Sequence, residues 1–459
     1  MSSPSEKLIE RVAGAPAYVL DKTIDSSKQF SKVFVSRRNI NQARNYWKSL
    51  GPGLTTGAAD DDPSGITTYS QAGAAYGFSL LWTSIFTFPL MAVVQEMCAR
   101  IGLVTGRGLA ANIRQYYPKW VLYLATFLLF FANSLNIGAD LGAMAKATQL
   151  LVPHFSFTSL ILGFTIISLA LQIFTSYEKY AKYLKWLALV LVSYVLSALS
   201  VNLNWAEVFQ KTIVPAITFS KDQIILITAV LGTTISPYLF FWQTSQEVEE
   251  QILGGKTTLK LRQEETTKKE VVSMRTDVWS GMFLSNLVMF FIIAAAGATL
   301  NAAGITNITS AEQAAAALKP LAGEWSFLLF ALGIIGTGML AVPVLAGSAS
   351  YALSESFGWK LGLYRKLKEA NAFYGVIIIS TGIGLAINFL GFDPIKALIY
   401  TAVANGLISP VILILIVLMS SNGKIMGRWV NNLITTFLGW LVVLIMTLAG
   451  AATIYYLLV

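Results

Sequence analysis

The sequence predicts an all-α integral membrane protein with eleven transmembrane helices, arranged as two five-helix repeats and one extra helix. Three observations support this fold class. The 459 residues are 55% hydrophobic and 12% charged, whereas soluble domains contain about 25% charged residues. Apolar segments of membrane length recur from residue 50 onward, and proline and polar residues interrupt the first and the sixth. This composition excludes an ordinary cytosolic enzyme, a secreted disulfide scaffold and a disordered chain.

Eleven apolar segments are long enough to cross a membrane, because a helix needs about 20 residues to span the hydrocarbon core. Their apolar runs are continuous and lack strand alternation, which predicts helices rather than barrel strands. They lie near residues 50–77, 79–99, 120–151, 156–176, 180–202, 222–246, 277–300, 325–351, 371–390, 394–420 and 430–458.

The segments divide the chain into two repeats with connecting parts. Between the repeats we expect an extracytoplasmic connection, and within the second repeat a cytoplasmic loop, 247–276, which we interpret as a solvated linker because of its dense charge. The expected parts are an N-terminal tail 1–47, a first repeat 48–202, the connection 203–221, a second repeat 222–420 and an extra helix within 421–459.

The basic residues predict the orientation in the membrane. All but five of the 33 Lys and Arg residues lie in the tail or in the loops that follow every second segment. Cytoplasmic loops are enriched in Lys and Arg, so we expect a plasma-membrane protein with its N-terminus in the cytoplasm and its C-terminus outside. The same loops account for the net charge of +9, and no nucleic-acid partner is expected.

The first segment contains three consecutive aspartates, Asp60–Asp62, followed by Pro63. On insertion scales an Asp at the centre of a membrane helix costs about 2.5–3.5 kcal/mol, so the three must face water, protein or a cation. Pro63 removes a backbone hydrogen bond and disfavours helical geometry at Asp62, and Gly65 adds conformational freedom. We expect an unwound stretch at Asp62–Gly65 that exposes carbonyl oxygens.

The sixth segment has a matching interruption at Pro237, which follows Ser236 and the pair Thr233–Thr234. A proline in a membrane helix is by itself often only a kink. Paired interruptions at corresponding positions of two halves, however, mark the binding site of a transporter. Since each half has an odd number of helices, the second repeat is inverted relative to the first.

The residues near both interruptions predict a site for a hard cation. They include no Cys, His or Met; the single Cys98 and the single His154 lie elsewhere. Carboxylate, hydroxyl and carbonyl oxygens favour magnesium, calcium or manganese, and magnesium tends to bind through one or two carboxylates while it keeps several waters. Asp140, inside the third segment, is a candidate for the water-filled ion path, with a buried structural hydrogen bond as the alternative.

At these residues the chain resembles the Nramp family of divalent-metal transporters. The resemblance runs from Gly51-Pro52-Gly53 through the tenth segment, so it covers most of the chain. The family's Asp-Pro-Gly-Asn motif is here Asp62-Pro63-Ser64-Gly65, and its Met-Pro-His motif is Ser236-Pro237-Tyr238. Further matching stretches are Gln71-Ala72-Gly73, Leu81-Trp82, Val104-Thr105-Gly106 and Gly138-Ala139-Asp140.

The resemblance implies the LeuT fold and a metal site built from both broken helices. Asp62 matches the family's metal-binding aspartate, Gly65 stands where the family has an Asn ligand, and Ser236 replaces the family's Met. Thr233 matches the position of a backbone-carbonyl ligand, and Tyr238 and Gln243 stand at two histidine positions. The expected metal ligands are thus Asp62, Gly65, Thr233 and Ser236, and the residues expected beside the ion path are Asp61, Asp140, Tyr238 and Gln243.

Each departure from the family pattern removes a soft ligand or a proton-relay group. Together they resemble the branch called Nramp-related magnesium transporters. This resemblance implies import of partly hydrated magnesium, with manganese as a second candidate ion, by alternating access without proton coupling. The alternative is a proton-coupled importer of manganese or iron.

Other functional classes fit less well. The aspartates would repel the carboxylate of an organic substrate, and one His and one Cys cannot supply the closed ligand set of a metalloenzyme. We expect no enzymatic activity, no cofactor and no obligate protein partner. The expected partners are the transported divalent metal ion and the lipid bilayer.

Overall fold

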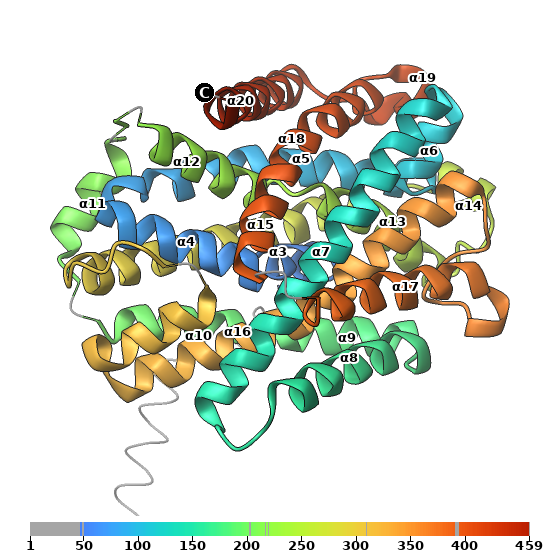
Figure 1. Cartoon of the computed structure of the whole chain (residues 1–459). Helices are drawn as coiled ribbons and strands as arrows, with labels where there is room; N and C mark the ends of the chain where they lie inside the picture. Colours follow the sequence, from blue (N-terminus) through green and yellow to red (C-terminus); the bar gives the residue numbers. More distant parts are fainter. Residues whose placement is uncertain are drawn as a thin grey trace, which may run out of the picture. The chain divides into compact units, whose positions relative to one another are not determined.

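The computed structural model describes residues 46–47, 50–201, 203–215, 217–218, 220–308, 310–390 and 394–458. The chain divides into two compact units, Met1–Leu50 and Gly51–Val459, and the fold below is that of the second. The predicted tail 1–47 lies outside the described residues except for Tyr46 and Trp47. Helices dominate the second unit, and no strand occurs in the part of the chain that the structure describes (Figure 1).

All eleven predicted segments form helices. They correspond to α3 with α4 (Pro52–Asp60, Pro63–Tyr76), α5 (Trp82–Thr105), α7 (Lys119–Leu151), α8 (Phe157–Phe174), α9 with α10 (Tyr177–Leu187, Val192–Leu199), α12 with α13 (Lys221–Thr234, Pro237–Leu253), α15 (Lys268–Ala296), α16 (Ala311–Phe357), α17 (Asn371–Ile387), α18 (Pro394–Ser420) and α20 (Leu433–Leu458). Shorter helices connect them: α6 (Leu109–Tyr116), α11 (Trp205–Ile213), α14 (Leu259–Glu264) and α19 (Gly423–Met426).

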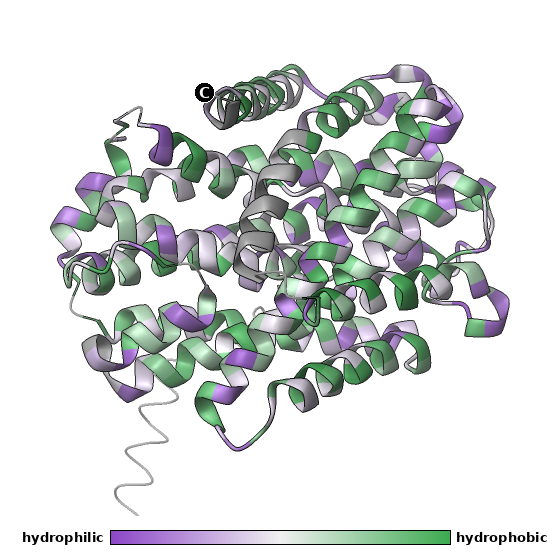
Figure 2. Ribbon diagram, in the orientation of Figure 1, coloured by the Kyte–Doolittle hydropathy of each residue, from purple (hydrophilic) through white to green (hydrophobic). Residues whose placement is uncertain are grey.

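By length and composition, eight helices of the described chain can span a membrane, or nine if the bent pair at α18 and α19 is one span. The others fall short individually: α3 and α4 are the two halves of a broken helix, and α17 has 17 residues. The count of eleven spans therefore stays a prediction. Hydrophobic residues cover most of the long helices, and hydrophilic residues concentrate in the turns and short helices at their ends (Figure 2).

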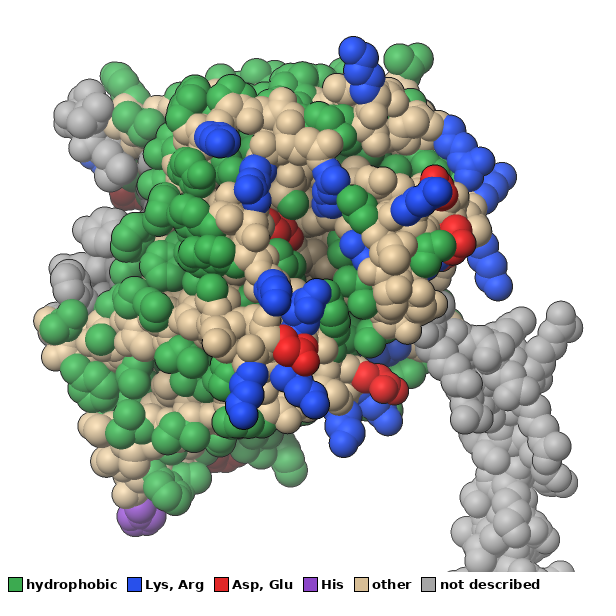
Figure 3. All heavy atoms as spheres, turned by 90° about the vertical axis from the view of Figure 1, so that its right-hand side faces the viewer, with side chains coloured by type: hydrophobic (Ala, Val, Ile, Leu, Met, Phe, Trp, Pro, Cys, Tyr) green, Lys and Arg blue, Asp and Glu red, His purple; other side chains and the backbone are tan. Residues whose placement is uncertain are grey.

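The loops that we expect to be cytoplasmic lie together at one end of the helices, the right-hand end of Figure 1. This end carries α6, α14 and α19. Seen directly, it displays more Lys and Arg than Asp and Glu (Figure 3). The alternation of basic and non-basic loops along the sequence is thus also a separation in space, as the positive-inside rule requires.

The helix contacts repeat between the two halves of the chain. Both halves of the first broken helix, α3 and α4, pack on α15. In the same way α13, the second half of the other broken helix, packs on α5. Likewise α7 packs on α18, as α16 packs on α10. Each contact has its counterpart when the first five segments are matched in order to the next five, which is the pattern of a five-plus-five repeat.

Glycines allow the broken helices to approach their partners closely. A Cβ atom on Gly57 of α3 would lie 2.2 Å from the carbonyl oxygen of Gly281 in α15, and one on Gly102 of α5 would lie 2.2 Å from that of Thr244 in α13. Small residues at such crossings let backbones touch, which is a main source of helix association in membranes. In both repeats, therefore, a glycine allows close backbone contact between the broken helix and its partner.

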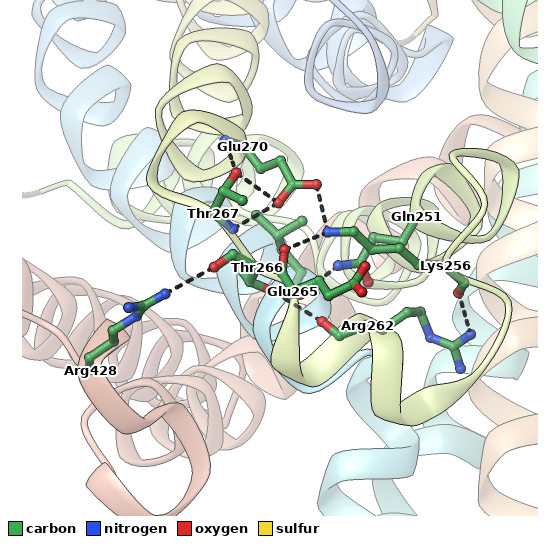
Figure 4. A network of polar contacts seen from close by, with 9 residues as sticks. Gln251, Lys256, Arg262, Glu265, Thr266, Thr267, Glu270 and Arg428 are labelled. Atoms are coloured by element: carbon green, nitrogen blue, oxygen red, sulfur yellow. Dashed lines mark hydrogen bonds and ion pairs between the residues drawn. The ribbon is translucent and has the colours of Figure 1, made fainter.

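Much of the loop 247–276 is exposed, as we expected of a solvated linker, but it also contains helical structure and contacts α5. α13 continues to Leu253, α14 occupies Leu259–Glu264 and α15 begins at Lys268. Its polar side chains bind the end of α5: Gln251 Nε2 donates to the carbonyl of Leu103 at 2.8 Å, and Arg262 Nε donates to that of Gly106 at 3.1 Å. Gln251 and Arg262 belong to a network of polar contacts that also includes Lys256 and Glu270 (Figure 4). The density of charge did not predict these contacts. The last carbonyl groups of a helix have no partner within it, so those at the end of α5 accept hydrogen bonds from Gln251 and Arg262.

We expect Gly57→Ala to destabilise the protein, because the added methyl group meets a backbone oxygen that cannot rotate away. Overpacking of this kind costs about 1–3 kcal/mol. The measurement is the thermal unfolding temperature of the purified protein in detergent. Gly163→Ala in α8 is the matched control, since an added Cβ there has nothing within 4 Å. Equal unfolding temperatures for both variants would contradict the close contact between α3 and α15.

Candidate functional site

Both broken helices have the same construction. α3 ends at Asp60 and α4 begins at Pro63, while α12 ends at Thr234 and α13 begins at Pro237. Each break is two residues long and is followed by proline at the first helical position. Proline is favoured there because that residue's N–H has no partner within the helix.

The break in the first segment lies earlier than we expected. We expected unwinding at Asp62–Gly65, but only Asp61 and Asp62 lie outside the helices, and Gly65 belongs to the first turn of α4. The expectation was wrong because it treated Pro63 as a residue that extends the break. In fact Pro63 starts the next helix, and Asp62 is the N-cap residue of that helix.

Two hydrogen bonds fix the Asp62 carboxylate. Its Oδ1 accepts the backbone N–H of Gly65 at 2.7 Å, and its Oδ2 accepts from Asn136 Nδ2 of α7 at 2.8 Å. A carboxylate at a helix N-terminus also interacts favourably with the helix dipole. Asp62 is therefore buried and held in one orientation by hydrogen bonds to both of its oxygens.

The two breaks face one another through Gly65 and Thr233. A Cβ atom on Gly65 would lie 3.4 Å from Thr233 Oγ1 and 3.1 Å from the carbonyl oxygen of Asp60. The Ser236 hydroxyl donates to the carbonyls of Thr233 at 2.7 Å and Gly232 at 2.9 Å. The structure thus brings the four expected ligand residues into one neighbourhood, and the missing side chain of Gly65 lets the two helices approach closely there.

Two of the residues expected beside the ion path are buried carboxylates at this site. Asp61 follows α3 directly, and neither of its carboxylate oxygens has a hydrogen-bond partner. The same holds for both oxygens of Asp140 on α7, which lies one helical turn after Asn136, the residue that binds Asp62.

The other two side chains form bonds of their own. Tyr238 Oη donates to the carbonyl of Ala59 at 2.8 Å, so this phenol ties the start of α13 to the last turn of α3. Gln243 Nε2 donates to Glu247 at 2.9 Å, one turn further along α13 and away from the break. Tyr238 thus links α13 to α3 beside the breaks, whereas Gln243 is bonded within α13.

Three further residues, which we did not predict, hold the site. These are Asn136, which binds Asp62, Ser285 of α15, which donates to Asp60 Oδ2 at 2.8 Å, and Tyr69, whose hydroxyl lies 3.1 Å from Thr234 Oγ1. Asn136 had a usable signal, because it lies four residues before Asp140 and so shares a face of α7 with it. Ser285 and Tyr69 have no such signal in the sequence.

The site is rich in acceptor oxygens that have no donor. They include Asp60 Oδ1, both oxygens of Asp61 and of Asp140, and Asn136 Oδ1. Buried polar atoms without a partner are rare and costly, and a cation or its bound water would satisfy these. The described residues contain no group of three or more Asp, Glu, His or Cys side chains that could together hold a metal ion. The acids at the breaks therefore do not form a complete set of metal ligands by themselves.

Comparison with known proteins identifies the family. A family model described as natural resistance-associated macrophage protein-like (Nramp) matches residues 53–456. The chain belongs to the Nramp family. Because Nramp proteins are metal-ion transporters, the chain is an integral membrane transporter and not an enzyme. The family resemblance drawn from the two interrupted segments is confirmed.

Individual Nramp relatives agree with this assignment. The chain is 26% identical over 403 residues to the "Divalent metal cation transporter MntH" of Klebsiella pneumoniae, covering 86% of this chain and 91% of the relative. It also resembles the crystal structure of the Eremococcus coleocola manganese transporter, with 17% identity, a TM-score of 0.69, and coverage of 89% of this chain and 86% of that one.

A more distant fold match is Mhp1, a nucleobase-cation-symport-1 family transporter. It has 16% identity, a TM-score of 0.53, and coverage of 89% of this chain and 91% of that one. These similarities confirm the predicted all-α, LeuT-type fold of this Nramp protein. That it belongs to the magnesium branch stays a prediction from the residues at the two breaks.

We expect Asn136→Ala to weaken binding of the transported ion, because Asp62 loses the donor that orients it. A hydrogen bond to a charged group contributes about 1.5–3 kcal/mol, which corresponds to a rise of roughly 10- to 150-fold in the half-saturating ion concentration. The measurement is divalent-ion uptake into proteoliposomes. Asn133→Ala is the control, since Asn133 on the same helix binds the carbonyl of Leu345. Half-saturation that rises equally in both variants would count against the role of Asn136.

Proposed function

We propose that this Nramp protein imports divalent metal cations, chiefly partly hydrated magnesium, by alternating access and without proton coupling. The observation that carries the proposal is the donor set at the two breaks. Asp62, Thr233 and Ser236 offer carboxylate, hydroxyl and carbonyl oxygens, and Gly65 lets the two broken helices approach closely. Oxygen ligands favour magnesium and manganese, whereas a thioether or an imidazole would favour softer metals.

The unpartnered acceptors support a hydrated ion. Magnesium keeps several of its waters, and the hydrogens of metal-bound water point away from the ion. A site for such an ion therefore needs acceptors around it, as Asp61, Asp140 and Asn136 Oδ1 provide. The absence of a closed carboxylate cage among the described residues also suits an ion that must leave again.

The side chains near the site support uncoupled transport. Where the family pattern has a proton-linked histidine, Tyr238 is bonded to the Ala59 carbonyl. The only histidine, His154, is exposed in the turn after α7. An inside-negative potential favours entry of a dication by about 4.6 kcal/mol per 100 mV, which is twice the value for one charge, so a second driving ion is not required.

Alternating access needs contacts that open, and two buried glutamates supply them. Glu249 of α13 accepts from the Tyr351 hydroxyl of α16 at 2.6 Å and from the N–H of Leu363 at 2.8 Å. Glu355 of α16 accepts from the Ser245 hydroxyl of α13 at 3.0 Å. These bonds lock α13 against α16 at the basic end. We assign this end to the cytoplasm and the protein to the plasma membrane, with the C-terminus outside.

A proton-coupled manganese importer is the second candidate. It is favoured by the names of the similar proteins, a divalent metal cation transporter and a manganese transporter. It is also favoured by Asp140, a buried acid on α7 whose two carboxylate oxygens have no hydrogen-bond partner. The donor set at the breaks favours the first candidate.

Ion uptake into proteoliposomes separates the two candidates. The same preparation is loaded with dyes for magnesium, manganese and internal pH. We expect magnesium to enter without acidification, because neither break carries a soft ligand or a histidine. Manganese entry with acidification and without magnesium transport would refute the proposal.

We expect Asp62→Ala to abolish uptake of the divalent ion, because the only carboxylate with two fixed hydrogen bonds at the break is lost. The measurement is the same uptake assay, with equal amounts of inserted protein. Asp222→Ala is the control: Asp222 is an exposed acid in the first turn of α12, at the far end of the other broken helix. Near-normal uptake by the Asp62 variant would show that the ion binds elsewhere.

A further inference from the structure

We propose that a basic cavity at the Lys- and Arg-rich end of the helices binds phosphate groups, with an anionic phospholipid headgroup as their source. The cavity has a volume of about 690 Å³, within the range of about 300–1,000 Å³ typical of small-ligand sites. It lies where three parts of the chain meet: the end of α5 with α6, the residues around α14, and the turn of α19 and η5 (Gly427–Trp429). None of the residues at the helix breaks lines it.

The cavity has an excess of positive charge. Arg107, Lys424 and Arg428 line it, against one acid, Glu264. In the described chain none of these three cations forms an ion pair, whereas nearby Lys256 is paired with Glu270 at 2.7 Å (Figure 4). Cations that share a cavity repel one another, and a bound anion removes the repulsion. Phosphate offers charge and several acceptor oxygens, which Arg and Lys bind well.

Backbone contacts hold the walls of the cavity in place. Arg428 Nη2 donates to the Thr266 carbonyl at 3.2 Å (Figure 4), and its guanidinium lies 4.9 Å from the centre of the Trp429 ring. Asn112 Nδ2 donates to the carbonyl of Arg107 at 3.1 Å. Gly106, with φ 63°, ends α5 in the left-handed conformation that the tight turn before Arg107 requires. A ligand would therefore meet cations on a preformed frame, which lowers the cost of binding.

Topology alone does not explain this arrangement. The positive-inside rule requires basic residues in these loops, but it does not require them to converge on one cavity. Lys424 and Arg428 lie on the short turn between the apolar helices α18 and α20, which places the turn at the membrane surface. Tyr116 and Trp429 also line the cavity, and both residue types are enriched at headgroup level. Basic pockets on the cytoplasmic side of such helices suit acidic headgroups.

The test compares ligands and variants of the full chain in a neutral detergent. The readout is the thermal unfolding temperature as a function of short-chain phosphatidylglycerol, short-chain phosphatidylcholine or free glycerol 1-phosphate. The cavity variant is Arg107→Gln/Lys424→Gln, which spares Arg428 because that side chain also holds Thr266. The matched control is Lys269→Gln/Lys368→Gln, which removes the same charge from exposed positions that do not line the cavity.

We expect phosphatidylglycerol, and not phosphatidylcholine, to stabilise the wild type and the control variant. In the cavity variant the half-saturating concentration should rise roughly 10-fold or more, because charge-assisted hydrogen bonds are lost. Equal responses of the cavity and control variants would overturn the site. A response to glycerol 1-phosphate as strong as that to the lipid, and lost in the cavity variant, would keep the phosphate site but assign it to soluble phosphate compounds.

The design separates loss of binding from loss of folding. Each variant is first checked for a single gel-filtration peak and for its unfolding temperature without ligand. If the double variant does not fold, Lys424→Gln alone replaces it, because Lys424 is exposed and its side chain has no bond to lose in the described structure. The outcome does not depend on which ion the protein transports.

Discussion

The capping of α4 by Asp62 is the interaction on which the site depends. A carboxylate inside a membrane protein needs compensation, and here the N–H of Gly65 and the amide of Asn136 provide it. The same cap sets where α3 stops and α4 starts, and so fixes the direction of both half-helices. The Gly65 backbone then lies opposite Thr233 of the second broken helix. One hydrogen-bonded side chain thus links the geometry of the break to the position of the carboxylate that we propose binds the transported cation.

The second constraint is close packing of the half-helices against their neighbours. Asp277 of α15 accepts the backbone N–H groups of Gly51, Gly53 and Leu54, at 2.8, 2.7 and 3.0 Å, and so caps the start of α3. Further along, Gly57 and Gly281 bring the two backbones together. A half-helix of nine residues cannot hold itself in place, so α15 supplies both its cap and its packing surface.

Much of the fold followed from the sequence because hydrophobic length and loop charge are properties of the chain itself. The eleven apolar segments are all helical, and both interruptions occur at the prolines that predicted them. The contacts of the loop 247–276 were not predicted, because whether Gln251 or Arg262 faces water or the carbonyls of α5 depends on neighbours about 150 residues away. The position of the break was also misjudged, because proline can either end a helix or begin one.

By itself the sequence determined the membrane class, the paired helix breaks, the oxygen-only donor set and the family, since each depends on residue types at short spacing. The tertiary structure alone decided which donors reach each carboxylate. Asn136 lies 74 residues from Asp62, and Ser285 lies 225 residues from Asp60. It also brought Arg107 to the same cavity as Lys424 and Arg428. Such contacts depend on how helices pack across the molecule, and helix packing follows from the shapes of whole surfaces rather than from any local pattern.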